Sequence, residues 1–139
     1  MISVSKTEYA LDASALLAVM LNEPGHENVR AVIDRAYIHA GNVAEVIGKL
    51  VREGVPRQEA EQMIQELGLA ITEELRISHA GQCGELLAMT RRQGLSLGDC
   101  VCLTVAASVG ATAVTADREW QQLHGQRLED GEIRVHVIR

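Results

Sequence analysis

Short apolar runs alternate with stretches of helical spacing along the whole chain, and this alternation limits the possible folds more than any other feature of the sequence. Five runs are predicted to be strands, at residues 9–11, 36–40, 69–71, 112–115 and 133–137. Helical patterns separate them, and glycines such as Gly68 and Gly110 mark the breaks. Strands that alternate with helices form βα units. We therefore predict one α/β domain over residues 1–139, with a mainly parallel sheet and helices on both faces.

The expected helices follow apolar residues spaced three and four positions apart. They are predicted at residues 14–21, at 42–53, from Pro56 to Gly68, around Cys83 to Gly94, at 99–109 and briefly after Asp117. A further helix is expected to carry Val29, Val32, Ile33 and Ala36 on one side. Residues 122–132 form the most loop-like stretch, and we find no repeat or low-complexity tract.

Composition argues against two common kinds of nucleic-acid binder. Aromatic residues make up 2% of the chain, so exposed stacking platforms for bases are not expected. The net charge of −6 argues against general binding to phosphate backbones, which usually needs a basic surface. If the chain acts on nucleic acid, something other than its overall charge must supply positive charge at the site.

The three cysteines, Cys83, Cys100 and Cys102, form no C-x-x-C pair. We interpret them as small buried apolar residues in a reducing compartment. No signal-peptide pattern is found, and Gly110 interrupts the uncharged stretch of residues 100–116. Such a stretch suits a buried helix and strand better than a membrane span. A cytoplasmic protein without membrane attachment is therefore expected.

Four acidic residues stand near the starts of predicted helices, and each has an interpretation as a helix cap. Asp12 and Asp117 precede helices at the position of an N-cap. The pairs Asn42–Glu45 and Ser96–Asp99 have the spacing of a capping box. Considered singly, each carboxylate is explained by this structural role.

Considered together, the acidic residues predict one site, formed by Asp12, Glu45, Asp99 and Asp117. The strands of a parallel sheet end at one edge and the following helices begin there, so these side chains can meet in a single pocket. Carboxylates at close range repel one another, and a divalent cation relieves the repulsion. All-oxygen ligands suit Mg²⁺ or Mn²⁺, and such an ion can activate water for attack on a phosphodiester. Bound cations would also supply the positive charge that the composition lacks.

Four short motifs contain these residues, namely Leu11–Leu16 (LDASAL), Asn42–Val46 (NVAEV), Leu95–Leu103 (LSLGDCVCL) and Val114–Trp120 (VTADREW). In this order and spacing they resemble the motifs of PIN-domain ribonucleases, and in particular those of VapC-type toxins of bacterial toxin–antitoxin pairs. The motifs span residues 11–120, and the chain has the length of a stand-alone PIN domain.

The resemblance implies a five-stranded parallel sheet and an Mg²⁺- or Mn²⁺-dependent endoribonuclease that acts as a toxin. It also implies an RNA substrate, a cognate antitoxin that inhibits the enzyme, and a homodimer. The catalytic and metal-binding positions of the family fall on Asp12, Glu45, Asp99 and Asp117. Ser14 and Thr115 take the positions of polar catalytic helpers, and Asn42 is the frequent Asn of the second motif, expected at the substrate. Arg118 is expected to contact RNA because it adjoins Asp117.

His39 departs from the family, whose members often carry a small hydroxyl residue at the end of the second strand. We expect it to be a capping or surface residue. Further candidates for phosphate contacts are Arg52, Arg57, Arg91 and Arg92, and Arg52 or Arg57 is alternatively expected at the antitoxin. One alternative function stays open, a non-catalytic PIN-like binding module that uses the acidic pocket for a metal or a protein partner. The intact set of four carboxylates favours the nuclease.

Overall fold

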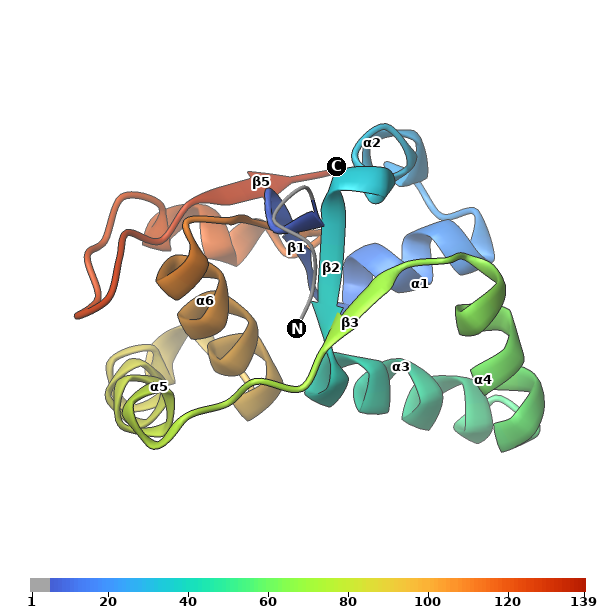
Figure 1. Ribbon diagram of the computed structural model, residues 1–139, viewed down its shortest axis with the longest axis horizontal. Coiled ribbons are helices and arrows are strands. Elements are labelled where there is room, and N and C mark those ends of the chain that lie inside the picture. Colours follow the sequence, from blue (N-terminus) through green and yellow to red (C-terminus); the bar gives the residue numbers. More distant parts are fainter. Residues whose placement is uncertain (1–5) are drawn as a thin grey trace.

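The computed structural model describes residues 6–139 and places a sheet of five parallel strands at its centre (Figure 1). The strands, with the order β3-β2-β1-β4-β5 across the sheet, are β1 (Tyr9–Leu11), β2 (Ala36–His39), β3 (Ala70–Thr72), β4 (Thr112–Thr115) and β5 (Val135–Val137). Parallel sheets are covered on both faces, which explains why most of these runs are apolar. The predicted α/β class with a five-stranded parallel sheet is confirmed.

Helices connect the strands. They are α1 (Ala13–Leu21), α2 (His26–Arg30), α3 (Ala40–Arg52), α4 (Arg57–Glu66), α5 (Ile77–Met89) and α6 (Leu97–Val109), with 3-10 helices η2 (Ile33–Arg35), η3 (Arg91–Gln93) and η4 (Arg118–Leu123). The prediction of one helix from Val29 to Ala36 is wrong, because α2 ends at Arg30 and Ala36 begins β2. Ala36 pairs with Tyr9 in the sheet, and this pairing requires extended backbone.

The helices cover both faces of the sheet and form two cores (Figure 1). Side chains alternate along a strand, so neighbours in β2 point to opposite faces. Tyr37 belongs to the core under α5 and α6, and Ile38 belongs to the core under α1, α3 and α4. The three cysteines are buried and free, as predicted. Across residues 6–139, no helix has both the length and the apolar character needed to cross a membrane.

The carboxyl ends of the central strands position the candidate site. Asp12 follows β1, and its backbone N–H donates to the carbonyl of Val114 in β4 at 3.1 Å. Thr115 ends β4 two residues before Asp117. The first turn of α6 lies against α3, so residues from four segments of the chain meet at this edge.

Candidate active site

A pocket of about 560 Å³ lies at the carboxyl edge of the sheet, and we call it the acidic pocket. Its lining residues are Asp12, Ala13, Ser14, Leu17, Glu45, Gly48, Lys49, Arg52, Asp99 and Asp117. The structure therefore brings together the four carboxylates that the sequence places in one site. They come from the start of α1, from α3, from the first turn of α6 and from the start of η4.

Asp12 is the most deeply buried of these carboxylates, with 3% of its surface exposed. One oxygen, Oδ1, accepts hydrogen bonds from the Ser14 hydroxyl at 2.7 Å and the Ala15 backbone N–H at 2.8 Å. The other, Oδ2, accepts from the Thr115 hydroxyl at 2.6 Å. Burial raises the pKa of Asp12 from an ordinary 3.8 to about 6, and the nearby charge of Asp99 adds to the rise against these hydrogen bonds.

Ser14 and Thr115 fix the position of the Asp12 carboxylate. While donating to Asp12, the Ser14 hydroxyl accepts from the backbone N–H of Ala116 at 2.9 Å. The Thr115 hydroxyl accepts in the same way from the N–H of Asp117 at 3.0 Å. These bonds join the start of α1 to the end of β4. Both predicted polar helpers therefore contact the carboxylate directly, and Ser14 also lines the pocket.

Glu45 is held from two sides. The amide nitrogen of Asn42, one turn earlier on α3, donates to Glu45 Oε1 at 2.9 Å and to the carbonyl of Gly98 at 3.0 Å. A Cβ added at Gly98 would collide with the Glu45 carboxylate, so glycine at this position gives the carboxylate room against α6. Asn42 is 1% exposed and does not line the pocket, which makes it a positioning residue for Glu45 and does not fit the direct RNA contact predicted for it.

The capping interpretation is right for three of the acidic residues and wrong for Glu45. Asp12 and Asp117 are N-caps, and Ser96 and Asp99 form a reciprocal capping box. The capping box predicted for Asn42 and Glu45 does not form, because α3 begins two residues earlier. There the imidazole Nδ1 of His39 accepts from the Gly41 N–H at 3.0 Å, so the predicted capping role of His39 is confirmed. Capping and pocket lining coexist in the same side chains.

The carboxylates of the acidic pocket act on one another. Burial raises the pKa of Glu45 and that of Asp99. The charge of Asp99 raises the pKa of Glu45 further, and the charge of Asp117 does the same to Asp99. A group of acidic oxygens with this mutual repulsion fits a hard divalent cation such as Mg²⁺ or Mn²⁺. Within residues 6–139, no three His, Cys, Asp or Glu side chains have the arrangement of a metal site, but Mg²⁺ usually binds through one or two carboxylates and keeps several waters.

Arg118 lies outside the acidic pocket. Its guanidinium donates to the backbone carbonyl of Arg139 at 3.0 Å. Although Arg118 follows Asp117 in the sequence, its side chain therefore does not line the site. Two cations line the pocket instead. Arg52 was one of several candidate arginines, and Lys49 was not predicted, although it lies one helical turn after Glu45.

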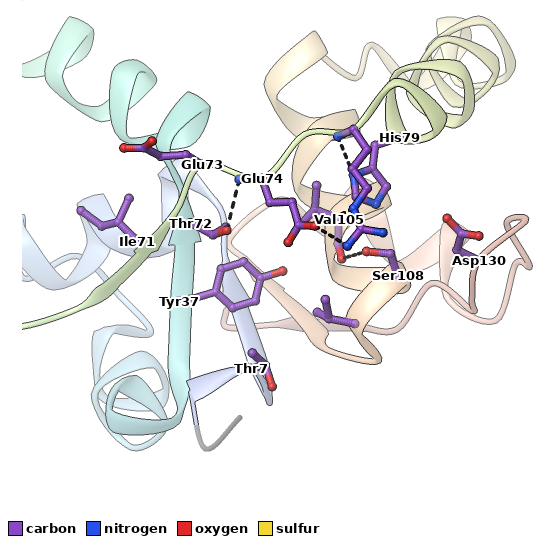
Figure 2. Close-up of a pocket in the computed structure, with 12 residues that line it drawn as sticks. Thr7, Tyr37, Ile71, Thr72, Glu73, Glu74, His79, Val105, Ser108 and Asp130 are labelled. Carbon is purple, nitrogen blue, oxygen red and sulfur yellow. Dashed lines mark hydrogen bonds and ion pairs between the residues drawn. The ribbon is translucent and has the colours of Figure 1, made fainter. Parts of the chain in front are cut away.

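A second and larger pocket, of about 980 Å³, lies over the face of β2 that carries Tyr37, and we call it the Tyr37 pocket (Figure 2). Figure 2 shows Tyr37 between β3 and α6, with Glu74 and Ser108 also directed toward the space. The Tyr37 hydroxyl is buried and has no hydrogen-bond partner among residues 6–139. None of the predicted site residues lines this pocket.

Comparison with known proteins agrees with this architecture. The sequence profile of the PIN domain family matches residues 9–125. No curated protein sequence matches the chain. Among solved structures, DNA-bound VapBC from Salmonella typhimurium is similar, with a TM-score of 0.69 and 20% identity over 95% of this chain and 98% of that chain. DNA-bound VapBC2 from Rickettsia felis has a TM-score of 0.67 and 15% identity over 93% and 97% of the two chains. VapBC-1 from nontypeable Haemophilus influenzae gives 0.61 and 18% over 93% and 96%.

The fold and the pocket together define a class of protein, the parallel α/β domains with acidic residues at the carboxyl edge of the sheet. The chain belongs to the PIN domain family, whose profile covers most of its length and all four carboxylates. PIN domains are in general nucleases that use divalent metal ions. The family expected from the sequence motifs is thus confirmed by the profile. The solved structures, at 15–20% identity, show that the fold is shared.

Proposed function

We propose that this chain is a divalent-metal-dependent endoribonuclease and that Asp12, Glu45, Asp99 and Asp117 form its catalytic and metal-binding site. The observation that carries the proposal is the convergence of these four carboxylates in one pocket at the carboxyl edge of the sheet. A purely structural domain gains little from such mutual repulsion, which opposes the burial of Asp12 and Asp99.

The side chains of the pocket have distinct tasks in this proposal. Ser14 and Thr115 fix both oxygens of Asp12, and Asn42 orients one oxygen of Glu45. When bound, a divalent cation supplies Lewis acidity, neutralises charge on the phosphate and makes water a stronger nucleophile. The protein holds its carboxylates where that cation and the scissile phosphate must meet, which removes much of the entropic cost of alignment.

We further infer that the nuclease is a VapC-type toxin with a cognate antitoxin. The three similar structures are of VapBC assemblies, and they cover nearly the whole of this chain. Homodimer formation and cytoplasmic location stay predictions. Induction of the chain alone in a bacterial host is expected to arrest growth, and an Asp99→Asn variant expressed at the same level is expected to permit it. Normal growth on strong induction of folded wild-type protein would contradict the toxin role.

The nuclease is tested on mixed cellular RNA with the purified chain. Cleavage is expected with Mg²⁺ or Mn²⁺, and it should disappear with a chelator or with Asp99→Asn. An Asp130→Asn variant, which removes a carboxylate that lines only the Tyr37 pocket, serves as the matched control. If the wild type neither cleaves RNA nor binds Mn²⁺ in a titration, the non-catalytic binding module replaces the nuclease.

A further inference from the structure

Helix α3 carries two cations into the acidic pocket. Lys49 and Arg52 line it together with Glu45 of the same helix. The three residues are four and three positions apart, which places them along one face of the helix. At a rise of about 1.5 Å per residue, the two cations start about 6 Å and 10 Å from Glu45 along the helix axis.

Neither cation is paired within the part of the chain that the structure describes. Arg35, Arg57 and Arg76 are each bound to a neighbouring glutamate, at Glu8, Glu61 and Glu74. Over residues 6–139 no ion pair and no side-chain hydrogen bond involves Lys49 or Arg52, although four carboxylates line the same pocket. Two charges beside an acidic site thus stay available to an anionic ligand.

Gly48 leaves the wall of the pocket open beside these cations. It lies inside α3, where glycine destabilises a helix relative to alanine. No packing contact explains it, because a Cβ added there would meet no atom within 4 Å. Gly48 lines the pocket, so the missing side chain permits a ligand to approach the helix between Glu45 and Lys49.

Resting on the proposed nuclease function, we propose that Lys49 and Arg52 bind the phosphate groups next to the scissile phosphodiester, so that the RNA strand runs along α3. A cation at the carboxylates would neutralise only the phosphate being cleaved. The neighbouring phosphates of the strand face a chain with a net charge of −6 and need their own positive partners. The face of α3 provides them, whereas Arg118 is bound to Arg139 outside the pocket.

Binding without cleavage tests this inference separately from the nuclease. In an Asp99→Asn background, a labelled single-stranded RNA of mixed sequence is titrated by fluorescence anisotropy at several salt concentrations. Lys49→Ala with Arg52→Ala is expected to weaken binding about tenfold or more and to lower the slope of log affinity against log salt by roughly 1.4, about 0.7 for each lost phosphate contact. The matched control is Arg127→Ala, which removes an exposed cation outside the acidic pocket.

Lys49→Arg with Arg52→Lys should restore the slope, because the contacts depend on charge. Two results would overturn the inference even if the wild type cleaves RNA. One is an unchanged salt slope in the double alanine variant, and the other is no RNA binding by the Asp99→Asn parent at any salt concentration. A loss of binding in the double variant would uphold it even if wild-type cleavage is absent. A poly-glutamate peptide is titrated in the same way. If it binds the parent as tightly as the RNA does and loses as much affinity in the double alanine variant, the two cations are assigned to an acidic protein partner instead of RNA.

Discussion

The acidic pocket at the carboxyl edge of the sheet and the Tyr37 pocket over one of its faces differ in size and in how their charged groups act on one another. The Tyr37 pocket is larger, about 980 Å³ against about 560 Å³, and its only arginine is in an ion pair among its own lining residues. Arg76 binds Glu74, and the backbone N–H of Arg76 donates to His79 Nδ1 at 3.0 Å. In the acidic pocket, neighbouring carboxylates raise the pKa of Asp12, Glu45 and Asp99, and the two cations beside them are unpaired over residues 6–139. Carboxylates close enough to raise the pKa of their neighbours mark the candidate site better than volume does.

The largest expected effect compares one glutamate from each pocket. Glu45→Gln keeps an acceptor for Asn42 but removes a charge from the acidic pocket, and we expect RNA cleavage to fall by at least about 100-fold, the usual scale for lost electrostatic stabilisation of a transition state. Glu74→Gln breaks an exposed pair with Arg76 in the Tyr37 pocket and should leave the cleavage rate unchanged. Initial rates on one RNA substrate measure both. Equal losses in the two variants would remove the distinction between the pockets.

The second prediction concerns the stability cost of the acidic pocket. The pKa of Asp12 is about 6 in the folded chain against an ordinary 3.8, so between about pH 4 and pH 6 the folded state holds a proton that the unfolded state has lost. Stability from this group is therefore present at low pH and is lost as the pH rises to about 6. Asp12→Asn removes the loss, and at pH 7 it should stabilise the fold by up to about 3 kcal/mol.

Thermal unfolding from pH 3.5 to pH 7.5 measures this effect, provided that metal is kept out with a chelator. The variant should melt several degrees above the wild type at pH 7. The two melting temperatures should converge toward pH 3.5, below the ordinary pKa of 3.8, because Asp12 is then mostly protonated in both states. A variant that melts below the wild type at pH 7 would show that the hydrogen bonds to the charged carboxylate outweigh its burial.

The fold and the acidic residues were predictable because they depend on local patterns. Apolar runs predict the strands, and carboxylates near the ends of strands predict the edge where they meet. The helix predicted through Ala36 is wrong because spacing alone does not show that Ala36 pairs with Tyr9. The start of α3 differs because His39, a residue type outside the usual N-cap preferences, accepts the capping hydrogen bond.

The supporting parts of the site were not predictable in the same way. Gly98 matters because α6 lies against α3 and the Glu45 carboxylate occupies the space beside its Cα. Lys49 matters because the same face of α3 continues into the pocket. The role of Gly98 depends on the distance between two helices that are more than 40 residues apart in the sequence, and no local pattern reports that distance. Lys49 has a local signal, since it lies one helical turn after Glu45, but only the structure shows that this face of α3 enters the pocket.

A third prediction uses this packing. Gly98→Ala places a methyl group against the Glu45 carboxylate, which can swing away at little cost to stability, so we expect a cleavage rate about tenfold lower with a nearly unchanged melting temperature. Gly84→Ala in α5 is the matched control, because a Cβ there meets no atom within 4 Å. It should stabilise the helix by about 0.5–1 kcal/mol and leave cleavage unchanged. Wild-type cleavage by Gly98→Ala would show that the position of Glu45 against α6 is not needed.

The smallest expected effect tests whether the Tyr37 pocket is functionally silent. The Tyr37 hydroxyl is buried without a partner over residues 6–139, and an unpaired buried hydroxyl opposes folding. Tyr37→Phe removes only that oxygen, so we expect a gain in stability of up to about 1 kcal/mol in denaturant unfolding and no change in RNA cleavage. If the variant instead unfolds at lower denaturant or cleaves more slowly, the hydroxyl has a partner in solution. Slower cleavage would also make the larger pocket part of the functional machinery, and the acidic pocket would no longer be the only candidate site among residues 6–139.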